Sequence, residues 1–151
     1  MDAVKKAELE SLADAGGGLL TPEAVVEFAK NPTTALHGEF TWDDSEAGRL
    51  YRLQQARSVI RVHVEMLPSI GQTTRAFVSI PSDRANAGGY RRTSDVLANP
   101  RWRGQAYEDA LKHVGSLRKR FAYLPELAPL FDRMEADVRQ FIVESVAKAA
   151  G

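Results

Sequence analysis

Residues 124–147 constrain the fold most, because they carry a broad apolar stripe at helical spacing. Apolar side chains that recur every three or four positions line one face of a helix. The stripe consists of Leu127, Leu130, Phe131, Met134, Val138, Phe141 and Ile142. A second helix is predicted from Asn99-Pro100, a cap followed by a first-position proline, to about residue 122. The connection between the two helices is short, which predicts an antiparallel helical hairpin.

The second helix carries its apolar residues at the same spacing. Its predicted buried face consists of Trp102, Ala106, Ala110, Val114, Leu117 and Phe121. The triplet Arg118-Lys119-Arg120 lies near its C-terminus, where positive charge favours the helix dipole. Contact with nucleic acid is the alternative interpretation of the triplet.

Capping signals predict two helices near the N-terminus. Thr21-Pro22-Glu23 supplies a cap, a first-position proline and a first-turn acid, which predicts a helix over residues 22–30. A short polar helix is predicted over residues 2–14, and Gly16-Gly17-Gly18 ends it as a flexible joint. We therefore expect residues 1–18 to form a loosely docked helix and linker, and residues 19–151 to form one domain.

Residues 36–61 concentrate aromatic and charged side chains. The loop before the next helix contains Leu36, Phe40 and Trp42, which predicts that it is pinned to a core. Asp43 and Glu46 have the spacing of a capping box, so the pair Asp43-Asp44 is interpreted as a helix start rather than as a metal or catalytic site. The predicted helix spans about 44–59. Its apolar stripe is Ala47, Leu50, Leu53, Ala56 and Ile60.

Two strands are predicted in the middle of the chain. Residues 62–67 and 73–80 alternate apolar and polar side chains, which is typical of an antiparallel hairpin. A lone hairpin is marginal and must pack on helices or on another copy. The predicted fold class is α+β and mainly helical, with N-terminal helices, a central antiparallel β-hairpin and a C-terminal antiparallel helical hairpin.

The formal net charge is zero, but the charges are segregated along the chain. Residues 1–48 contain three lysines and ten acidic residues, whereas residues 49–92 contain eight arginines, Glu65 and Asp83. Two interpretations follow. Either a basic surface meets an acidic partner, or the two segments neutralise each other inside the fold.

The basic segment makes a nucleic-acid-associated regulator or accessory factor, with DNA as the expected ligand, the leading functional hypothesis. Residues 81–93 are predicted to form a mobile loop that combines glycine with arginine and tyrosine, a composition suited to charge and stacking contacts. The candidate contact residues are Arg84, Tyr90, Arg91, Arg92, Arg57 and Arg61. Helices 22–30 and 44–60 suggest a helix-turn-helix. Their connection of about a dozen residues exceeds the usual three to four, so it is at most a distant variant with the hairpin as a wing.

A protein-binding factor that modulates a host protein or acts in assembly is the alternative hypothesis. The acidic segment 1–48 and the aromatic residues Phe40 and Trp42 favour it. Self-association is a third possibility, because the hairpin and the last helix can each pair across a two-fold axis.

Signals for enzymatic or cofactor chemistry are weak. The chain has no cysteine, and His37, His63 and His113 lack metal-ligand spacing. His37 beside the two aspartates is the one acid–base candidate, and capping explains those aspartates better. We therefore expect no enzyme activity, no cofactor and no metal. No apolar run reaches the roughly 18 residues of a membrane span, which favours a cytoplasmic location.

The sequence resembles a family of small bacteriophage and prophage proteins with a Leu-His-x-x-Phe-x-Trp-Asp-Asp motif. The shared residues are Leu20 to Glu23, Val25-Val26, Pro32, Leu36-His37, Phe40, Trp42-Asp43-Asp44, Tyr51-Arg52, Gln55-Ala56-Arg57, Arg75 to Ser79, Gly89-Tyr90-Arg91 and Val96-Leu97. The chain departs from the family at Thr34-Ala35, where Ser-Pro is frequent, and at Gly48, where alanine is usual. The resemblance implies a viral origin and life inside a bacterial host, and it assigns no catalytic or binding residue.

Overall fold

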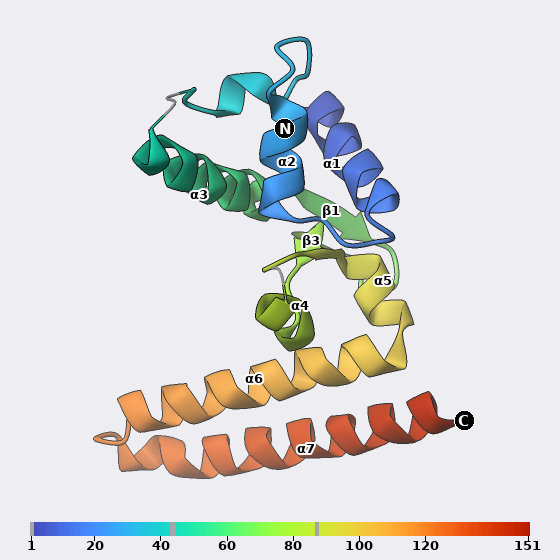
Figure 1. Ribbon diagram of the computed structural model, residues 1–151. Coiled ribbons are helices and arrows are strands. Elements are labelled where there is room, and N and C mark those ends of the chain that lie inside the picture. Colours follow the sequence, from blue (N-terminus) through green and yellow to red (C-terminus); the bar gives the residue numbers. More distant parts are fainter. Residues whose placement is uncertain (1, 43–44, 87) are drawn as a thin grey trace. The chain divides into compact units, whose positions relative to one another are not determined.

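The computed structural model describes residues 2–42, 45–86 and 88–151 and is mainly helical (Figure 1). Its helices are α1 (Ala3–Ala15), α2 (Pro22–Ala29), α3 (Glu46–Val62), α4 (Pro81–Asn86), α5 (Thr93–Ala98), α6 (Pro100–Arg120) and α7 (Ala128–Ala150), with 3-10 turns at His37–Glu39 and Pro125–Leu127. Its strands are β1 (Val64–Leu67), β2 (Gln72–Arg75), β3 (Phe77–Val78) and β4 (Arg91–Arg92). The predicted mainly helical α+β class is confirmed, with both the β-hairpin and the C-terminal helical hairpin.

The chain forms two compact units. The first comprises Met1–Ser79 with Asp83–Asp95, and the second comprises Ile80–Ser82 with Val96–Gly151. Helices α1 to α3 and all four strands therefore belong to the first unit, and the α6–α7 hairpin belongs to the second. The sequence led us to expect one domain over residues 19–151, whereas the main division falls between residues 95 and 96.

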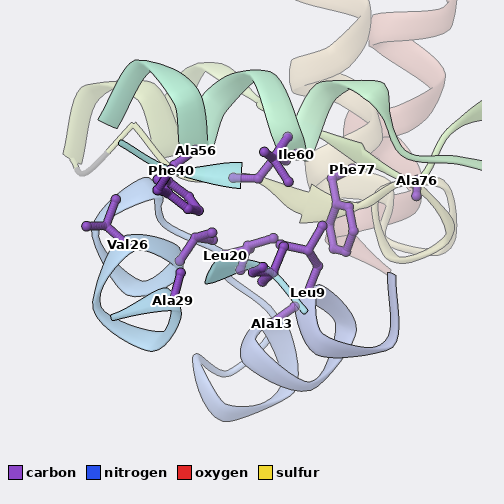
Figure 2. Packing of buried hydrophobic residues seen from close by; sticks show 13 residues of the cluster. Leu9, Ala13, Leu20, Val26, Ala29, Phe40, Ala56, Ile60, Ala76 and Phe77 are labelled. Carbon is purple, nitrogen blue, oxygen red and sulfur yellow. The ribbon is translucent and has the colours of Figure 1, made fainter. Parts of the chain in front are cut away.

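The core of the first unit is built by α1, α2, α3 and β3 together with the loop before α3 (Figure 2). Its buried members are Leu9, Ala13, Leu20, Val25, Val26, Ala29, Leu36, Phe40, Ala56, Val59, Ile60, Ala76 and Phe77. The predicted pinning of the loop is confirmed, because Leu36 and Phe40 lie inside this core. The prediction that Leu50 belongs to it is wrong, because 54% of that side chain is exposed.

Helix α1 is an integral part of this core rather than a loosely docked segment. Leu9 and Ala13 are completely buried. The carboxylate of Glu8 accepts hydrogen bonds from the backbone N–H groups of Ala35 and Leu36, at 2.8 and 3.0 Å. These contacts tie α1 to a loop more than twenty residues away in sequence, which short-range sequence patterns do not reveal.

The triple glycine forms a tight turn instead of a flexible joint. Gly17 and Gly18 have φ angles of 62° and 87°, which favour glycine over residues with a side chain. The backbone N–H of Gly18 donates to the carbonyl of Ala13 at 2.7 Å, a bond that closes the end of α1. A Cβ on Gly16 would lie 2.2 Å from the Leu19 carbonyl oxygen, so all three glycines serve the turn.

The predicted helix starts at residues 21 and 99 are confirmed. The Thr21 hydroxyl accepts from the backbone N–H of Ala24 at 3.1 Å. The Asn99 side chain accepts from the N–H groups of Arg101 and Trp102. Helix α3 is capped by Ser45, whose hydroxyl accepts from Gly48 at 3.0 Å. The aspartates 43 and 44, to which the sequence assigned this cap, lie outside the described residues.

The predicted hairpin is confirmed as β1 and β2, which pair antiparallel with Val64 opposite Arg75. The remainder of the predicted second strand is β3, which pairs with β4 from residues 91–92. The expected mobile loop over 81–93 is therefore wrong over most of its length, because it contains α4 and β4. The sequence missed β4 because a strand of two residues has no periodic pattern.

The second unit is dominated by the antiparallel helices α6 and α7 (Figure 1). Gly104 and Val114 of α6 and Phe131 and Ser145 of α7 are buried. The prediction of a buried face on α6 is wrong for Leu117, which is 45% exposed. Three members of the apolar stripe predicted for the last helix are also exposed, namely Leu130, Met134 and Phe141. Within the described residues, no helix combines the length and apolar character needed to cross a membrane.

Candidate nucleic-acid interface

Arg91 is held by a buried carboxylate. Its Nε and Nη2 donate to the two carboxylate oxygens of Asp83 at 2.7 and 2.8 Å. The side chain of Asp83 is 5% exposed and that of Arg91 is 15% exposed. Such a bidentate pair fixes both side chains. Arg91 therefore closes the segment between α4 and β4, and its guanidinium is engaged inside the first unit.

Arg92 is also held by acidic groups of its own fold. Its Nη1 donates to the carboxylate of Asp14 at 2.6 Å, and its Nη2 donates to the backbone carbonyl of Glu10 at 2.8 Å. The hydrogen bond between these two side chains lowers the pKa of Asp14 and raises the pKa of Arg92. Arg92 therefore pairs the basic segment with the acidic segment, whereas Arg91 is neutralised by Asp83 inside the basic segment itself.

Tyr90 and Arg84 also contact the fold. The backbone N–H and carbonyl of Tyr90 pair with those of Leu20, both at 2.7 Å, and the Tyr90 side chain packs against the core. Arg84 is exposed, and its Nη1 donates to the carbonyl of Ser79 at 3.3 Å. The structure thus gives the predicted contact segment 84–92 an extensive set of internal contacts.

The four arginines of α3 divide into two pairs. Arg49 forms an ion pair with Glu46 at 2.9 Å, one turn earlier on the same helix. Arg52 donates to the Thr41 carbonyl, and its guanidinium carbon lies 5.6 Å from the ring centroid of Trp42. Both arginines in the N-terminal half of α3 therefore contact neighbouring parts of the first unit.

The arginines in the C-terminal half, Arg57 and Arg61, lie on the outer face of α3. Gln54, Arg57, Ser58 and Arg61 occupy positions i, i+3, i+4 and i+7, so they share one face of the helix. Arg61 donates from Nε to the backbone carbonyl of Arg57 at 3.1 Å. Among the described residues, neither arginine forms an ion pair with a carboxylate.

The β1–β2 hairpin follows α3 after a single residue and adds a further arginine. Arg75 is exposed and pairs with Val64, three positions beyond Arg61. In the described part of the chain, Arg75 forms no ion pair. We define the α3–hairpin surface as Gln54, Arg57, Ser58, Arg61 and Arg75. Sequence analysis missed Gln54, Ser58 and Arg75, although the i, i+3, i+4, i+7 spacing on α3 is visible in the sequence.

The aromatic motif before α3 is a packed cluster. Trp42 stacks on His37 with ring centroids 5.0 Å apart, and its Nε1 donates to the His37 carbonyl at 3.3 Å. The Nδ1 of His37 hydrogen-bonds with the Ala29 carbonyl at 2.7 Å. Phe40 is 8% exposed. The contacts of His37 orient the loop, and the proposed acid–base cluster with residues 43 and 44 falls outside the described residues.

Metal-ligating side chains are dispersed in the structure. The described residues contain no group of three or more histidine, cysteine or acidic side chains arranged to hold a metal ion. The buried His63 hydrogen-bonds through Nδ1 with the Val59 carbonyl at 2.7 Å, and the exposed His113 does the same with Asp109 at 2.8 Å. Each of these histidines thus bonds to the carbonyl four residues earlier, His63 just after the end of α3 and His113 within α6.

The carboxylate of Glu65 on β1 is partly removed from solvent, which is unfavourable for its charged form. Its Oε1 is buried and has no hydrogen-bond partner in the part of the chain that the structure describes. Burial raises the pKa of Glu65 against the opposing attraction of Lys6. Folding therefore favours the protonated form of this side chain.

We expect Glu65→Gln to stabilise the protein at neutral pH. The unfolded chain ionises Glu65 more easily than the folded chain does, so the charge costs stability above the raised pKa. Below the ordinary carboxyl pKa both states are protonated and the cost disappears. Thermal unfolding at pH 7 should show a midpoint about 2–4 °C higher for the variant, the shift made by a change of up to about 1 kcal/mol. Equal midpoints at pH 7 would contradict this account, as would a gain that persists unchanged at pH well below the ordinary carboxyl pKa.

No protein-family model, no curated protein and no solved structure matches this chain. The geometry of the α3–hairpin surface is accordingly the basis on which a function is inferred.

Proposed function

We propose that the first unit binds nucleic acid, with duplex DNA as the preferred form, through the α3–hairpin surface. In this proposal the protein is a phage-encoded regulatory or accessory factor that acts in the cytoplasm of a bacterial host. The family resemblance of the aromatic motif and its neighbours supports the viral origin. The α3–hairpin surface supports the binding activity.

The observation that carries the proposal is the polar outer face of α3. Arginine and glutamine make the commonest paired hydrogen bonds to guanine and adenine in the major groove, and that groove admits a helix. Gln54, Arg57 and Arg61 lie together on the side of α3 that faces away from the buried Ala56 and Ile60. A helix with its apolar side in the core and this polar side outward is suited to enter a groove.

The position of the hairpin adds a contact for the phosphate backbone. Phosphate contacts fix the register and orientation of a protein on the duplex, while base contacts select the sequence. Arg75 lies on β2, which pairs with β1, the strand that follows α3. We assign Arg75 and Arg61 to phosphates, and Gln54 and Arg57 to base edges. The hairpin then acts as a wing beside α3.

A gel-shift titration with the double variant Arg57→Ala/Arg61→Ala tests the proposal. The wild-type protein should bind duplex DNA at about 50 mM salt and lose most of its affinity at about 200 mM, because neutralised phosphates release counterions. The double variant should bind at least about tenfold more weakly. Its logarithmic salt slope should fall by about one unit for each lost phosphate contact.

The matched control is Arg49→Ala. It also removes one exposed arginine from α3, but that arginine is already paired with Glu46. We expect Arg49→Ala to bind nearly as tightly as the wild type. Two results would overturn the proposal: no wild-type binding to duplex or single strand at low salt, or equal losses from Arg49→Ala and from the double variant.

The protein-binding alternative depends on exposed residues other than the Phe40 expected from the sequence. Phe40 is a core residue, whereas Tyr51 and Val62 are 54% and 67% exposed. Both line a groove on α3 together with Gln54 and Ser58. A loss of host-protein capture from Tyr51→Ala, with DNA binding unchanged, would favour this alternative.

A further inference from the structure

The seam between α6 and α7 leaves large apolar side chains uncovered. Small residues bring the two helices together at one point, where a Cβ on Gly104 would lie 3.4 Å from the Cβ of Ser145. Val114 of α6 and Phe131 of α7 are the other residues of these two helices that are buried. The remaining large apolar residues of the hairpin are therefore displaced from the seam onto its flanks.

One flank of α7 carries three of these residues in a row. Leu130, Met134 and Phe141 occupy positions i, i+4 and i+11, so they lie along one side of the helix. Their exposed fractions are 46%, 47% and 44%. Exposed aliphatic and aromatic side chains of this size, aligned along a helix, are typical of a surface that is covered by another protein chain.

Helix α6 extends this surface on the same side of the hairpin. The ring of Tyr107 lies 5.4 Å from that of Phe141, so these two residues face the same side. Tyr107 follows the buried Gly104 by three residues and Leu117 follows the buried Val114 by three residues, so both lie on the same flank of the seam, and Leu117 is 45% exposed. We define the hairpin face as Tyr107, Leu117, Leu130, Met134 and Phe141.

The whole side of the α6–α7 hairpin that carries the hairpin face, with its polar residues included, is large enough for a stable interface. The 21 residues of α6 extend about 32 Å at about 1.5 Å per residue. Two helices side by side are about 18–20 Å wide. One copy therefore offers about 600 Å², and two copies bury about 1,200 Å², which is the lower end of the range for specific stable interfaces.

Positively and negatively charged residues border the hairpin face. Arg103, Glu144 and Lys148 line a groove that also includes Tyr107 and Phe141. Arg103 donates to the Tyr107 hydroxyl at 3.0 Å, and Glu144 accepts from Gln140 at 3.0 Å. In the described part of the chain neither Arg103 nor Glu144 forms an ion pair. A two-fold interface requires a patch that complements itself, and a rim with an unpaired cation and an unpaired anion meets this requirement.

We propose that the hairpin face binds the same face of a second copy of this chain, forming a two-fold symmetric dimer with a four-helix arrangement. The five apolar residues form the centre of the interface. Arg103 of one copy pairs with Glu144 of the other at the rim. The surface lies wholly in the second unit, so this inference holds or fails separately from the proposed nucleic-acid function.

Light scattering coupled to gel filtration tests the dimer. The wild-type chain at micromolar concentration should have twice the monomer mass. Met134→Glu and Leu117→Glu should each weaken the dimer at least about tenfold, because each places a charge in the apolar centre of the interface. Val143→Glu is the matched control: Val143 is 67% exposed but lies two residues beyond Phe141, on another side of α7. It should leave the mass unchanged.

A second measurement separates loss of the dimer from loss of the fold. The natural chain has no cysteine, so a single engineered thiol reports on one position. Met134→Cys should cross-link to a dimer with a short bismaleimide, and Val143→Cys should not. A monomeric wild type at about 100 μM, above the dissociation constant of most interfaces of this size, overturns the proposal. Equal cross-linking at the two positions, or equal mass loss from Val143→Glu, also overturns it.

Discussion

Asp83→Ala should destabilise the first unit by about 3–5 kcal/mol, the usual cost of removing one partner from a buried ion pair. Asp83 is 5% exposed, and both of its carboxylate oxygens accept hydrogen bonds from Arg91. The variant leaves the guanidinium of Arg91 in a poorly hydrated position without its carboxylate. The backbone of Asp83 also anchors the chain, because its carbonyl accepts a hydrogen bond from the backbone N–H of Gly88 at 2.9 Å. Denaturant unfolding at pH 7 measures the loss.

The design of this experiment uses the two tryptophans of the chain. Trp42 belongs to the first unit and Trp102 to the second. A Trp102→Phe background therefore makes fluorescence report on the first unit alone. The matched control is Asp14→Ala, which removes the carboxylate partner of Arg92. That carboxylate is 67% exposed, so we expect little change. A similarly small effect of Asp83→Ala would show that the Asp83–Arg91 pair is not a major source of stability.

Local signals predicted the ends of several helices correctly. Thr21 before Pro22 and Asn99 before Pro100 cap α2 and α6, because a cap depends only on side chains within three residues. The alternation around β1 and β2 predicted their pairing for a similar reason, since the two strands are separated by one short turn. Information contained in a few neighbouring residues is sufficient for these elements.

Contacts between distant residues explain where sequence analysis failed. Arg92 pairs with Asp14, 78 positions earlier, and no local pattern indicates that partnership. From sequence, internal neutralisation and an exposed basic surface were equally compatible with the charge segregation. The structure places Arg91 and Arg92 in internal pairs and Arg57 and Arg61 on an outer helix face. The candidate site therefore moves from the segment 84–92 to α3 and the hairpin.

Helical periodicity alone also cannot tell a core from an interface. The spacing of Met134 and Phe141 fits a buried stripe equally well whether the covering surface is the same chain or a second copy. Within one copy, α7 uses Phe131 and Ser145 against α6, which leaves the neighbouring flank exposed. A stripe broader than one helix–helix seam thus leaves apolar side chains exposed within one copy.

Phe77→Ala should destabilise the first unit by about 3–5 kcal/mol, because truncating a buried phenylalanine leaves a cavity and loses its burial. Phe77 is 1% exposed and is the largest of the fully buried side chains. It lies on β3 and packs among residues of α1 and α3 (Figure 2). The loss should appear in the same denaturant unfolding of the Trp102→Phe background, as a lower midpoint with an unchanged slope.

Two further variants distinguish a cavity effect from a general weakness of the strand. Phe77→Leu keeps most of the apolar volume and should lose clearly less stability than Phe77→Ala. Val62→Ala removes an apolar side chain that is 67% exposed and should change stability by no more than about 0.5 kcal/mol. If Phe77→Ala and Val62→Ala cost the same, Phe77 does not hold α1 and α3 together. Since α3 carries the proposed contact residues, Phe77→Ala should also weaken DNA binding only at temperatures where the first unit begins to unfold, whereas Arg57→Ala/Arg61→Ala weakens it at every temperature.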